Sequence, residues 1–158
     1  MSNQENNGEK PEFRMQKMYL KDFSYENPNA PEIFQPQGKA EPNVELNIKL
    51  NNRKINDVNY EVSLVIDAKV TSKLEGGEEK NMFIIEVEHA GLFRLKNIPE
   101  EHLRMVLAVD CPTLLFPFTR QIVSQVSQDG GFIPFQMEPI NFMALFQNAQ
   151  NNQQNAQA

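Results

Sequence analysis

The sequence predicts an α+β fold, in which helices cover one face of an antiparallel sheet. Apolar residues recur with a period of two from Glu12 to Arg94, and from Ile98 to Phe146 the pattern becomes helical or irregular. Strands grouped ahead of helices are typical of α+β proteins, because βαβ units would alternate the two. At 158 residues the chain is expected to form one domain. Polar composition predicts disordered ends at residues 1–11 and 148–158.

Four segments are expected to form strands. The clearest is NVELNIKL at 43–50, and YEVSLVIDAKVT at 60–71 alternates in the same way, so the turn-like NNRKIND between them predicts a hairpin. EGGE at 75–78 predicts a second hairpin turn, which leads into NMFIIEVEHAGLF at 81–93. The first strand, EFRMQKMYLKDFS at 12–24, alternates less clearly. The long Pro-rich segment after it favours a Greek-key order of strands, although a meander stays open.

A long helix is expected to begin near Pro99 and to end at the two glycines at 130 and 131. Its apolar stripe is predicted to comprise Leu103, Leu107, Cys111, Leu114, Phe118, Ile122 and Val126. Pro112 and Pro117 fall inside the helix, so a kink or a brief break is expected at CPTLLFP. The aromatic segment FIPFQMEPINFMALF follows and ends in a short amphipathic helix.

Composition excludes several classes of function. A formal charge of −6 with no Lys/Arg-rich segment disfavours nucleic acid as a partner. The N-terminus lacks an apolar signal region and no run of 18 apolar residues occurs, so we expect a cytoplasmic protein without direct membrane insertion. The single cysteine, Cys111, cannot form an internal disulfide, which fits a reducing compartment.

Few residues are candidates for catalysis or metal binding. His102 and Cys111 lie nine residues apart on the predicted helix and cannot share a ligand sphere. His89 has only Glu86 and Glu88 nearby, which is a weak metal signal. The pattern therefore favours Cys111 as a small core residue and both histidines at surfaces or interfaces. It disfavours an enzyme, although a small-molecule enzyme that uses Cys111 or His89 stays open as an alternative.

Two segments outside the predicted core are unusually rich in aromatic residues. They are FSYENPNAPEIFQP at 23–36 and the segment after the long helix. A buried aromatic ring covers roughly 150 to 250 Å², and the largest apolar patch on an ordinary monomer covers about 300 to 600 Å². Four accessible rings would exceed that range. The rings therefore either pack on each other beneath a loop or line a binding groove.

These segments carry a resemblance to a known family. The runs KDFSYENPNAPEIF, FIIEVEHAGLF and CPTLLFPFTRQIVSQVSQDGGFIPFQMEPINFMALF, followed by a Gln-rich tail, resemble SecB, a family of bacterial protein-export chaperones. The resemblance covers about residues 12–147 as a single SecB-like domain. It implies a four-stranded antiparallel Greek-key sheet, with a long kinked helix and a short C-terminal helix packed on one face. It also implies a homotetramer built as a dimer of dimers.

The resemblance further implies a holdase with no enzymatic activity, no cofactor and no metal. Such a chaperone binds unfolded precursors of exported proteins, keeps them competent for translocation and delivers them to the SecA ATPase. A SecB-like chaperone dedicated to one narrow client, such as an antitoxin, is the alternative within the same class. The acidic charge fits a chaperone with exposed apolar grooves, because repulsion between copies opposes self-association.

The resemblance also assigns residues to three roles. SecA-binding positions match Asp22, Glu26, Ile84 and Glu86. Client-groove positions match Tyr25, Ile33, Phe34, Phe132, Phe135, Phe142, Leu145 and Phe146. Positions on the helix-facing or assembly side match Ile85, Val87 and His89, which strand parity places opposite Ile84 and Glu86. Here His89 replaces an amide that is common in the family.

Overall fold

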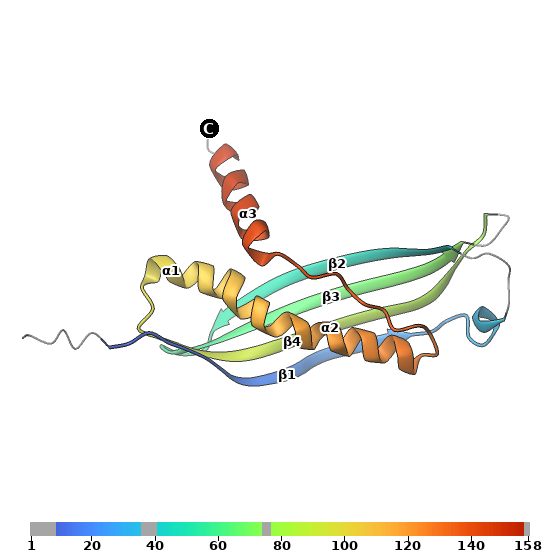
Figure 1. Ribbon diagram of the computed structural model, residues 1–158, viewed down its shortest axis with the longest axis horizontal. Coiled ribbons are helices and arrows are strands. Elements are labelled where there is room, and N and C mark those ends of the chain that lie inside the picture. The colour runs from blue at the N-terminus through green and yellow to red at the C-terminus, as the bar shows by residue number, and fades with distance from the viewer. Residues whose placement is uncertain (1–8, 36–40, 74–76, 157–158) are drawn as a thin grey trace, which may run out of the picture.

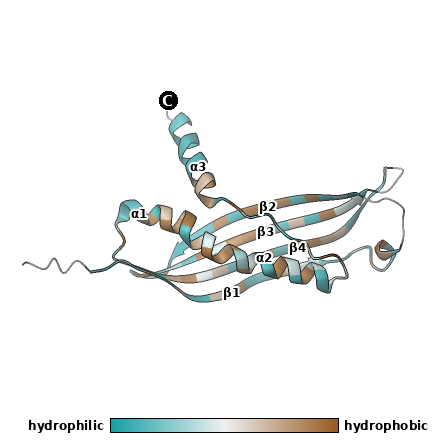
Figure 2. Cartoon of the chain, in the orientation of Figure 1, coloured by the Kyte–Doolittle hydropathy of each residue, from teal (hydrophilic) through white to brown (hydrophobic). Residues whose placement is uncertain are grey.

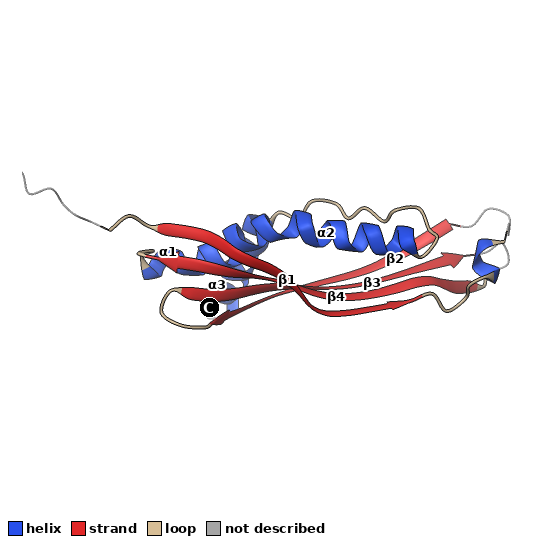
Figure 3. Cartoon of the chain, turned by 90° about the horizontal axis from the view of Figure 1, so that it is seen from below, coloured by secondary structure: helices blue, strands red, loops and turns tan. Residues whose placement is uncertain are grey.

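Four long strands form one antiparallel sheet, with all helices on one side of it (Figures 1 and 3). The computed structural model describes residues 9–35, 41–73 and 77–156. The strands are β1 (Glu12–Glu26), β2 (Glu41–Lys54), β3 (Asn59–Lys73) and β4 (Glu79–Lys96). They are ordered β1-β4-β3-β2. The second, third and fourth strands follow one another through hairpins and the first lies beside the fourth, so the Greek-key prediction is confirmed.

The centre of the sheet holds the core, as the alternating pattern of the third strand predicted. Alternate residues of β3 point toward the helices, and Val62, Leu64 and Ile66 are completely buried. On β2 the same pattern is only partly buried, because Val44 and Leu46 are each 43% exposed. No helix described in the structure covers that end of β2 (Figure 1). The predicted turn NNRKIND is shorter than expected, since the strand continues to Lys54.

Strand β1 alternates poorly in sequence because it contains two irregularities in its pairing with β4. The register shifts between Met15 and Lys17 and again between Leu20 and Asp22. In each case two residues of β1 occupy the space opposite one step of β4, which defines a β-bulge. Each bulge exchanges the two faces of the strand, so a period-two pattern cannot run through it.

The covering helix consists of α1 (Glu100–Met105), a π-helical turn (Val106–Asp110) and α2 (Cys111–Asp129). The expected irregularity is present, but it lies just before CPTLLFP rather than within it. A wide turn ahead of Pro112 accommodates a ring that would otherwise crowd the preceding turn. The helix then continues through Pro117 to its end next to Gly130.

Beyond this turn the predicted apolar stripe is wrong at Leu114 and Phe118, whereas Cys111 is fully buried and Ile122 and Val126 pack against the core. Leu114 and Phe118 are 41% and 46% exposed, whereas Leu115 and Val123 are completely buried. A π turn holds one more residue than an α turn and rotates every later side chain by about 100° around the helix axis. Extrapolating the spacing from Leu107 therefore misplaces Leu114 and Phe118.

Helix α3 (Phe142–Ala156) rises away from the sheet beside β2 and touches the body mainly through its first turns (Figure 1). Figure 2 shows that its apolar residues lie at its start and that the rest is hydrophilic. The tail predicted to be disordered from residue 148 is helical as far as Ala156. It contains no Pro or Gly, and its Gln and Ala residues extend a helix that the aromatic start anchors. The predicted disorder of residues 1–8, 157 and 158 lies outside the described residues.

By length and composition the helical stretch from Glu100 to Asp129 would suffice to cross a membrane. In this fold the stretch lies along the sheet, and it supplies buried residues such as Leu115 and Val123 to the core. Its apolar character is that of a core helix.

Candidate functional surfaces

Two side-chain hydrogen bonds hold the crossover that follows β1 in place. The Asn27 amide donates a hydrogen bond to the Gly130 carbonyl at the end of α2, at 3.1 Å. The Asn29 amide donates to the Asn81 carbonyl at the start of β4, at 2.8 Å. Ala30–Pro31 is a cis peptide bond, and a short 3₁₀ turn then presents Phe34. The asparagines of ENPNAP thus hold the crossover against two elements far away in the chain.

Four phenylalanines meet beneath this crossover, and we call them the aromatic cluster: Phe34, Phe83, Phe132 and Phe135. Phe83 is 2% exposed and forms the floor. Its ring centroid lies 5.0 Å from that of Phe132 and 6.2 Å from that of Phe135. Phe34 stacks on Phe132 at 5.1 Å and remains 47% exposed. The rings of the cluster therefore pack on each other around Phe83, while Phe34 stays exposed. The cluster has features of both a packed core under a loop and a binding groove.

The double glycine that ends α2 permits this packing. Gly131 has a φ of 92°, and a Cβ there would lie 2.9 Å from the Phe34 ring. At Gly130 a Cβ would overlap the Tyr25 hydroxyl. The Ser127 hydroxyl accepts a hydrogen bond from the Phe135 backbone N–H at 2.8 Å, which turns the chain back along the helix. These contacts bring Tyr25 and Phe34 to the end of α2, on the side where Phe132 and Phe135 pack.

Ile33 is half-buried in the 3₁₀ turn next to Phe34. The last three predicted groove residues lie elsewhere, against β2 and the π turn. Phe142, Leu145 and Phe146 line a cavity of about 210 Å³ with Ile48, Leu50 and Ala108. We call these three residues of α3 the α3 cluster. Leu145 is 55% exposed, but Phe142 is 4% exposed and packs edge-to-face on Phe116 at 6.0 Å. Phe142 is therefore a core residue, and the accessible apolar surface of the α3 cluster comes from Leu145 and the half-buried Phe146.

The predicted SecA-binding residues lie together on the opposite face of the sheet, which points away from the helices. Glu26 pairs with Ile84, and Ser24 pairs with Glu86 on the adjacent strand. Asp22 pairs with Glu88 one step further along. Asp22, Glu26 and Glu86 are exposed, and Ile84 is half-buried among them. We call Asp22, Glu26, Ile84 and Glu86 the outer acidic set.

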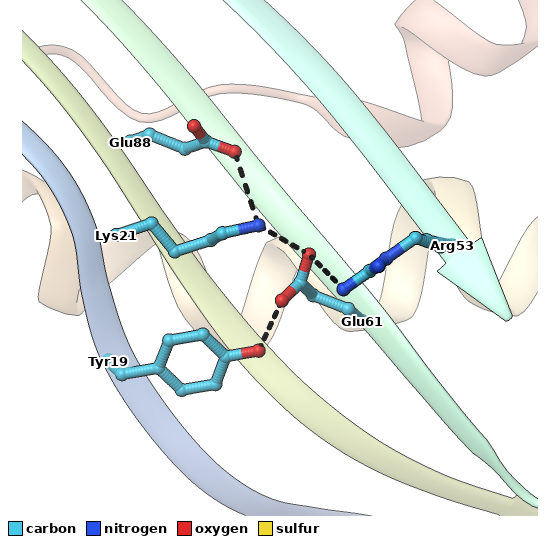
Figure 4. A network of polar contacts seen from close by, with 5 residues as sticks. All are labelled: Tyr19, Lys21, Arg53, Glu61 and Glu88. Carbon is cyan, nitrogen blue, oxygen red and sulfur yellow. Dashed lines mark hydrogen bonds and ion pairs between the residues drawn. The ribbon is translucent and has the colours of Figure 1, made fainter. Parts of the chain in front are cut away.

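Next to this set, Glu61 of β3 is the centre of a polar network that the sequence interpretation missed (Figure 4). It accepts hydrogen bonds from the Tyr19 hydroxyl at 2.5 Å and from Lys21 Nζ at 2.9 Å. The bond from Tyr19, followed by that from Lys21, lowers the pKa of Glu61. Burial, followed by the bond to Glu61, raises the pKa of Tyr19 to about 12. The only signal in the sequence was an acid within a strand whose other residues are mostly apolar.

Ile85, Val87 and His89 lie on the helix-facing side of β4, where they are 0%, 2% and 3% exposed. His89 Nδ1 shares a hydrogen bond with the Thr119 hydroxyl of α2 at 2.7 Å. Burial lowers the pKa of His89. The three side chains contact this chain's own core, so any influence on assembly would act through the position of α2.

Cys111 is completely buried, and burial raises the pKa of its thiol to about 12, so it lacks the thiolate character of a nucleophile. Among the described residues, no group of three or more His, Cys, Asp or Glu side chains is placed to hold a metal ion.

Comparisons with known proteins agree with this arrangement. A family model described as Preprotein translocase subunit SecB matches residues 6–154. The chain is 65% identical over 144 residues to the protein-export protein SecB of Desulfotalea psychrophila, covering 91% of this chain and 90% of that protein. It is 47% identical over 142 residues to the SecB of Magnetococcus marinus, covering 90% of this chain and 87% of the relative.

The fold also matches a solved structure, a SecB-like chaperone of Mycobacterium tuberculosis in complex with a ChAD peptide from an antitoxin. The TM-score is 0.55 at 16% identity, over 81% of this chain and 90% of that chain. The family model spans most of the sequence, and the two named relatives cover about nine-tenths of it. The chain belongs to the SecB family of protein-export chaperones.

Proposed function

We propose that this chaperone holds unfolded export precursors on the surface formed by the aromatic cluster and the α3 cluster, and passes them to SecA from the outer acidic set. The observation that carries the proposal is the separation of these surfaces by the sheet. Tyr25 and Glu26 are neighbours on β1, yet Tyr25 packs against the core on the helix side and Glu26 lies on the outer face. One strand thus supplies both surfaces, which keeps them close without overlap.

The client side is supported by apolar groups that stay accessible. Phe34 is 47% exposed, Leu145 is 55% exposed and Ile133, beside the aromatic cluster, is 89% exposed. Apolar contact is non-directional and scales with area, so such a surface accepts many sequences. An extended chain could cover both clusters, whereas a folded protein offers no such segment. Selectivity for unfolded precursors follows without recognition of a specific sequence.

The SecA side is supported by charge. Asp22, Glu26 and Glu86 surround the half-buried Ile84 on a regular sheet surface. Acids around one apolar side chain suit a basic partner that also carries a small apolar contact. The groups on this face do not contribute to the clusters that hold clients.

We propose that the protein is cytoplasmic and forms a homotetramer. The tetramer is proposed because a single subunit leaves apolar side chains uncovered. The exposed ones on β1 and α2 are Phe13, Met18, Leu20, Phe23, Leu114 and Phe118. They belong to an edge strand of the sheet and to the side of the helix that faces away from it. Surfaces of this kind mark interfaces between subunits.

The two surfaces can be separated by substitution. Glu86→Lys reverses one charge of the outer acidic set and should weaken SecA binding about tenfold or more, while the chaperone still prevents aggregation of an unfolded precursor. Phe34→Ser combined with Leu145→Ser should do the reverse, because both side chains are exposed and contribute little to the core. Binding of SecA by calorimetry and light scattering of an aggregating precursor measure the two activities. Loss of both activities in either variant would contradict the assignment.

A chaperone dedicated to one antitoxin is the second candidate, supported by the peptide bound to the fold neighbour from Mycobacterium tuberculosis. Cross-linking of captured proteins in cells distinguishes the two. Many export precursors support the general function, and a single antitoxin supports the dedicated one.

A further inference from the structure

The outer acidic set depends on one extra residue in β1. Leu20 is opposite His89 and Asp22 is opposite Glu88, so Lys21 is an insertion between two consecutive pairs. His89 points toward the helices and Glu88 toward the outer face. The bulge therefore changes which face each following residue of β1 occupies.

Without this bulge the end of β1 would be inverted. Asp22 would be opposite Val87 and would face the core, and Tyr25 would be opposite Ile84 on the outer face. The observed register instead places Asp22 and Glu26 outside and Tyr25 inside. The outer acidic set and the inward position of Tyr25 thus require Lys21 to remain outside the ladder.

Glu61 is placed to hold the bulge. It lies on β3 and reaches β1 across the intervening β4, because Tyr19 and Lys21 on either side of Leu20 both extend toward it (Figure 4). The register places Ala90 of β4 opposite Tyr19 and Leu92 opposite Glu61, so a small residue lies on one side of the crossing. Glu61 itself is only 8% exposed. Arg53 of β2, whose Nη2 atom lies 3.8 Å from Oε1 of Glu61, brings a positive charge to the same carboxylate from the strand on the other side of β3.

We propose that Glu61 is a positioning residue that fixes the bulge at Lys21 and thereby sets the register of Asp22, Glu26 and Tyr25. The proposal rests on the proposed function for its consequences, but its first claim concerns strand geometry alone. Two bonds from one carboxylate to residues on both sides of Leu20 fix the local path of the strand.

Glu61→Ala is the direct test, measured on the full-length assembled protein. Amide hydrogen exchange at residues 22–26 should accelerate about tenfold, because two charge-assisted hydrogen bonds are lost, while exchange in the centre of β3 stays unchanged. Glu61→Gln retains an acceptor for Tyr19 and should recover part of the protection. A uniform acceleration across the sheet would reveal only a contribution to stability and would overturn the proposal.

Lys21→Met separates positioning from charge. If the network acted on SecA only through charge, removing an acid with Glu61→Ala would weaken binding and removing a base with Lys21→Met would strengthen it. Positioning predicts weaker binding in both variants, by about fivefold to tenfold. Tighter binding of SecA to Lys21→Met would overturn the proposal. This variant also provides the test if Glu61→Ala does not fold.

Glu12→Ala is the matched control. It removes the 3.1 Å ion pair with Arg94, which joins β1 to β4 at the far end of β1. Neither exchange at residues 22–26 nor SecA binding should change. If exchange is as slow in Glu61→Ala as in this control, Glu61 does not hold the bulge. If wild-type protein fails to bind SecA, the proposed function is wrong, and the exchange measurement still decides the role of Glu61.

Discussion

At the scale of residues, polar side chains enclosed by the fold respond to pH in a predictable direction. His89 is enclosed between the sheet and α2, and burial lowers its pKa below the ordinary value of 6.5. Because the pKa of His89 is lower in the folded state than in the unfolded state, the unfolded state takes up a proton first as the pH falls, and the free energy of unfolding decreases. The contribution of His89 is fully present above pH 6.5 and is lost as the pH falls toward the folded pKa.

We therefore expect the free energy of unfolding to fall between pH 7.5 and pH 5.5 by more in the wild type than in His89→Gln. Glutamine can keep a hydrogen bond to Thr119 but carries no titrating group. Urea unfolding at the two pH values measures the difference, and His102→Gln is the control because that side chain is 59% exposed. An identical pH response in wild type and His89→Gln would show that the buried imidazole does not titrate in this range.

At the scale of elements, the π turn determines which side of α2 meets the sheet. It turns Leu115 and Val123 inward and leaves Leu114 and Phe118 outside. Neighbouring residues of one helix thus have different functions, Leu115 in the core of the subunit and Phe118 on a surface that another subunit can cover.

Leu115→Ala should lower the free energy of unfolding by about 2 to 5 kcal/mol, because it removes a fully buried side chain from a packed core. Phe118→Ser should instead promote dissociation into smaller species with little loss of secondary structure. Chemical unfolding and analytical ultracentrifugation of both variants measure the two effects. The opposite result, with Phe118→Ser unfolding the subunit, would place Phe118 in the core as the sequence spacing predicted.

The outcome of sequence prediction differs from element to element for physical reasons. The alternation of β3 was predicted correctly because β3 itself carries no inserted residue: the register shift between Val70 and Thr71 has its extra residue, Met82, on β4. The positions of Leu114 and Phe118 on α2 were predicted wrongly because the π turn inserts one residue ahead of them. For β1 the pattern predicted no clear face, since the inserted Lys21 exchanges the two faces of the strand. Pairing of Glu26 with Ile84 was accessible only through family resemblance, because parity within β4 cannot define its register with β1. The bonds from Tyr19 and Lys21 to Glu61 join residues 42 and 40 positions apart in the chain, for which no local pattern exists.

At the scale of the whole molecule, charge and apolar surface are divided between the two sides of one sheet. The helix side carries the uncovered apolar groups of β1 and α2, and the outer face carries the outer acidic set. A formal charge of −6 for each chain gives −24 for four. Such a charge limits association beyond the closed assembly.

We expect a solution mass of about 73 kDa, four times the 18.2 kDa of one chain. The mass should persist when salt is raised, because the uncovered side chains are apolar and salt screens only ionic contacts. Light scattering coupled to size-exclusion chromatography measures it. A stable species of one-chain mass would contradict the tetramer, and dissociation by salt alone would indicate ionic contacts between subunits.

The outward position of Leu114 and Phe118 has a consequence during biosynthesis. A subunit that has just left the ribosome presents exposed apolar side chains, which is the property by which the finished chaperone selects its substrates. If the proposed tetramer forms, each new copy is therefore a substrate for the assembled copies until it finds other subunits. Assembly depends on concentration, so synthesis of several copies from one messenger RNA would shorten the interval in which a subunit can be captured in place of a precursor.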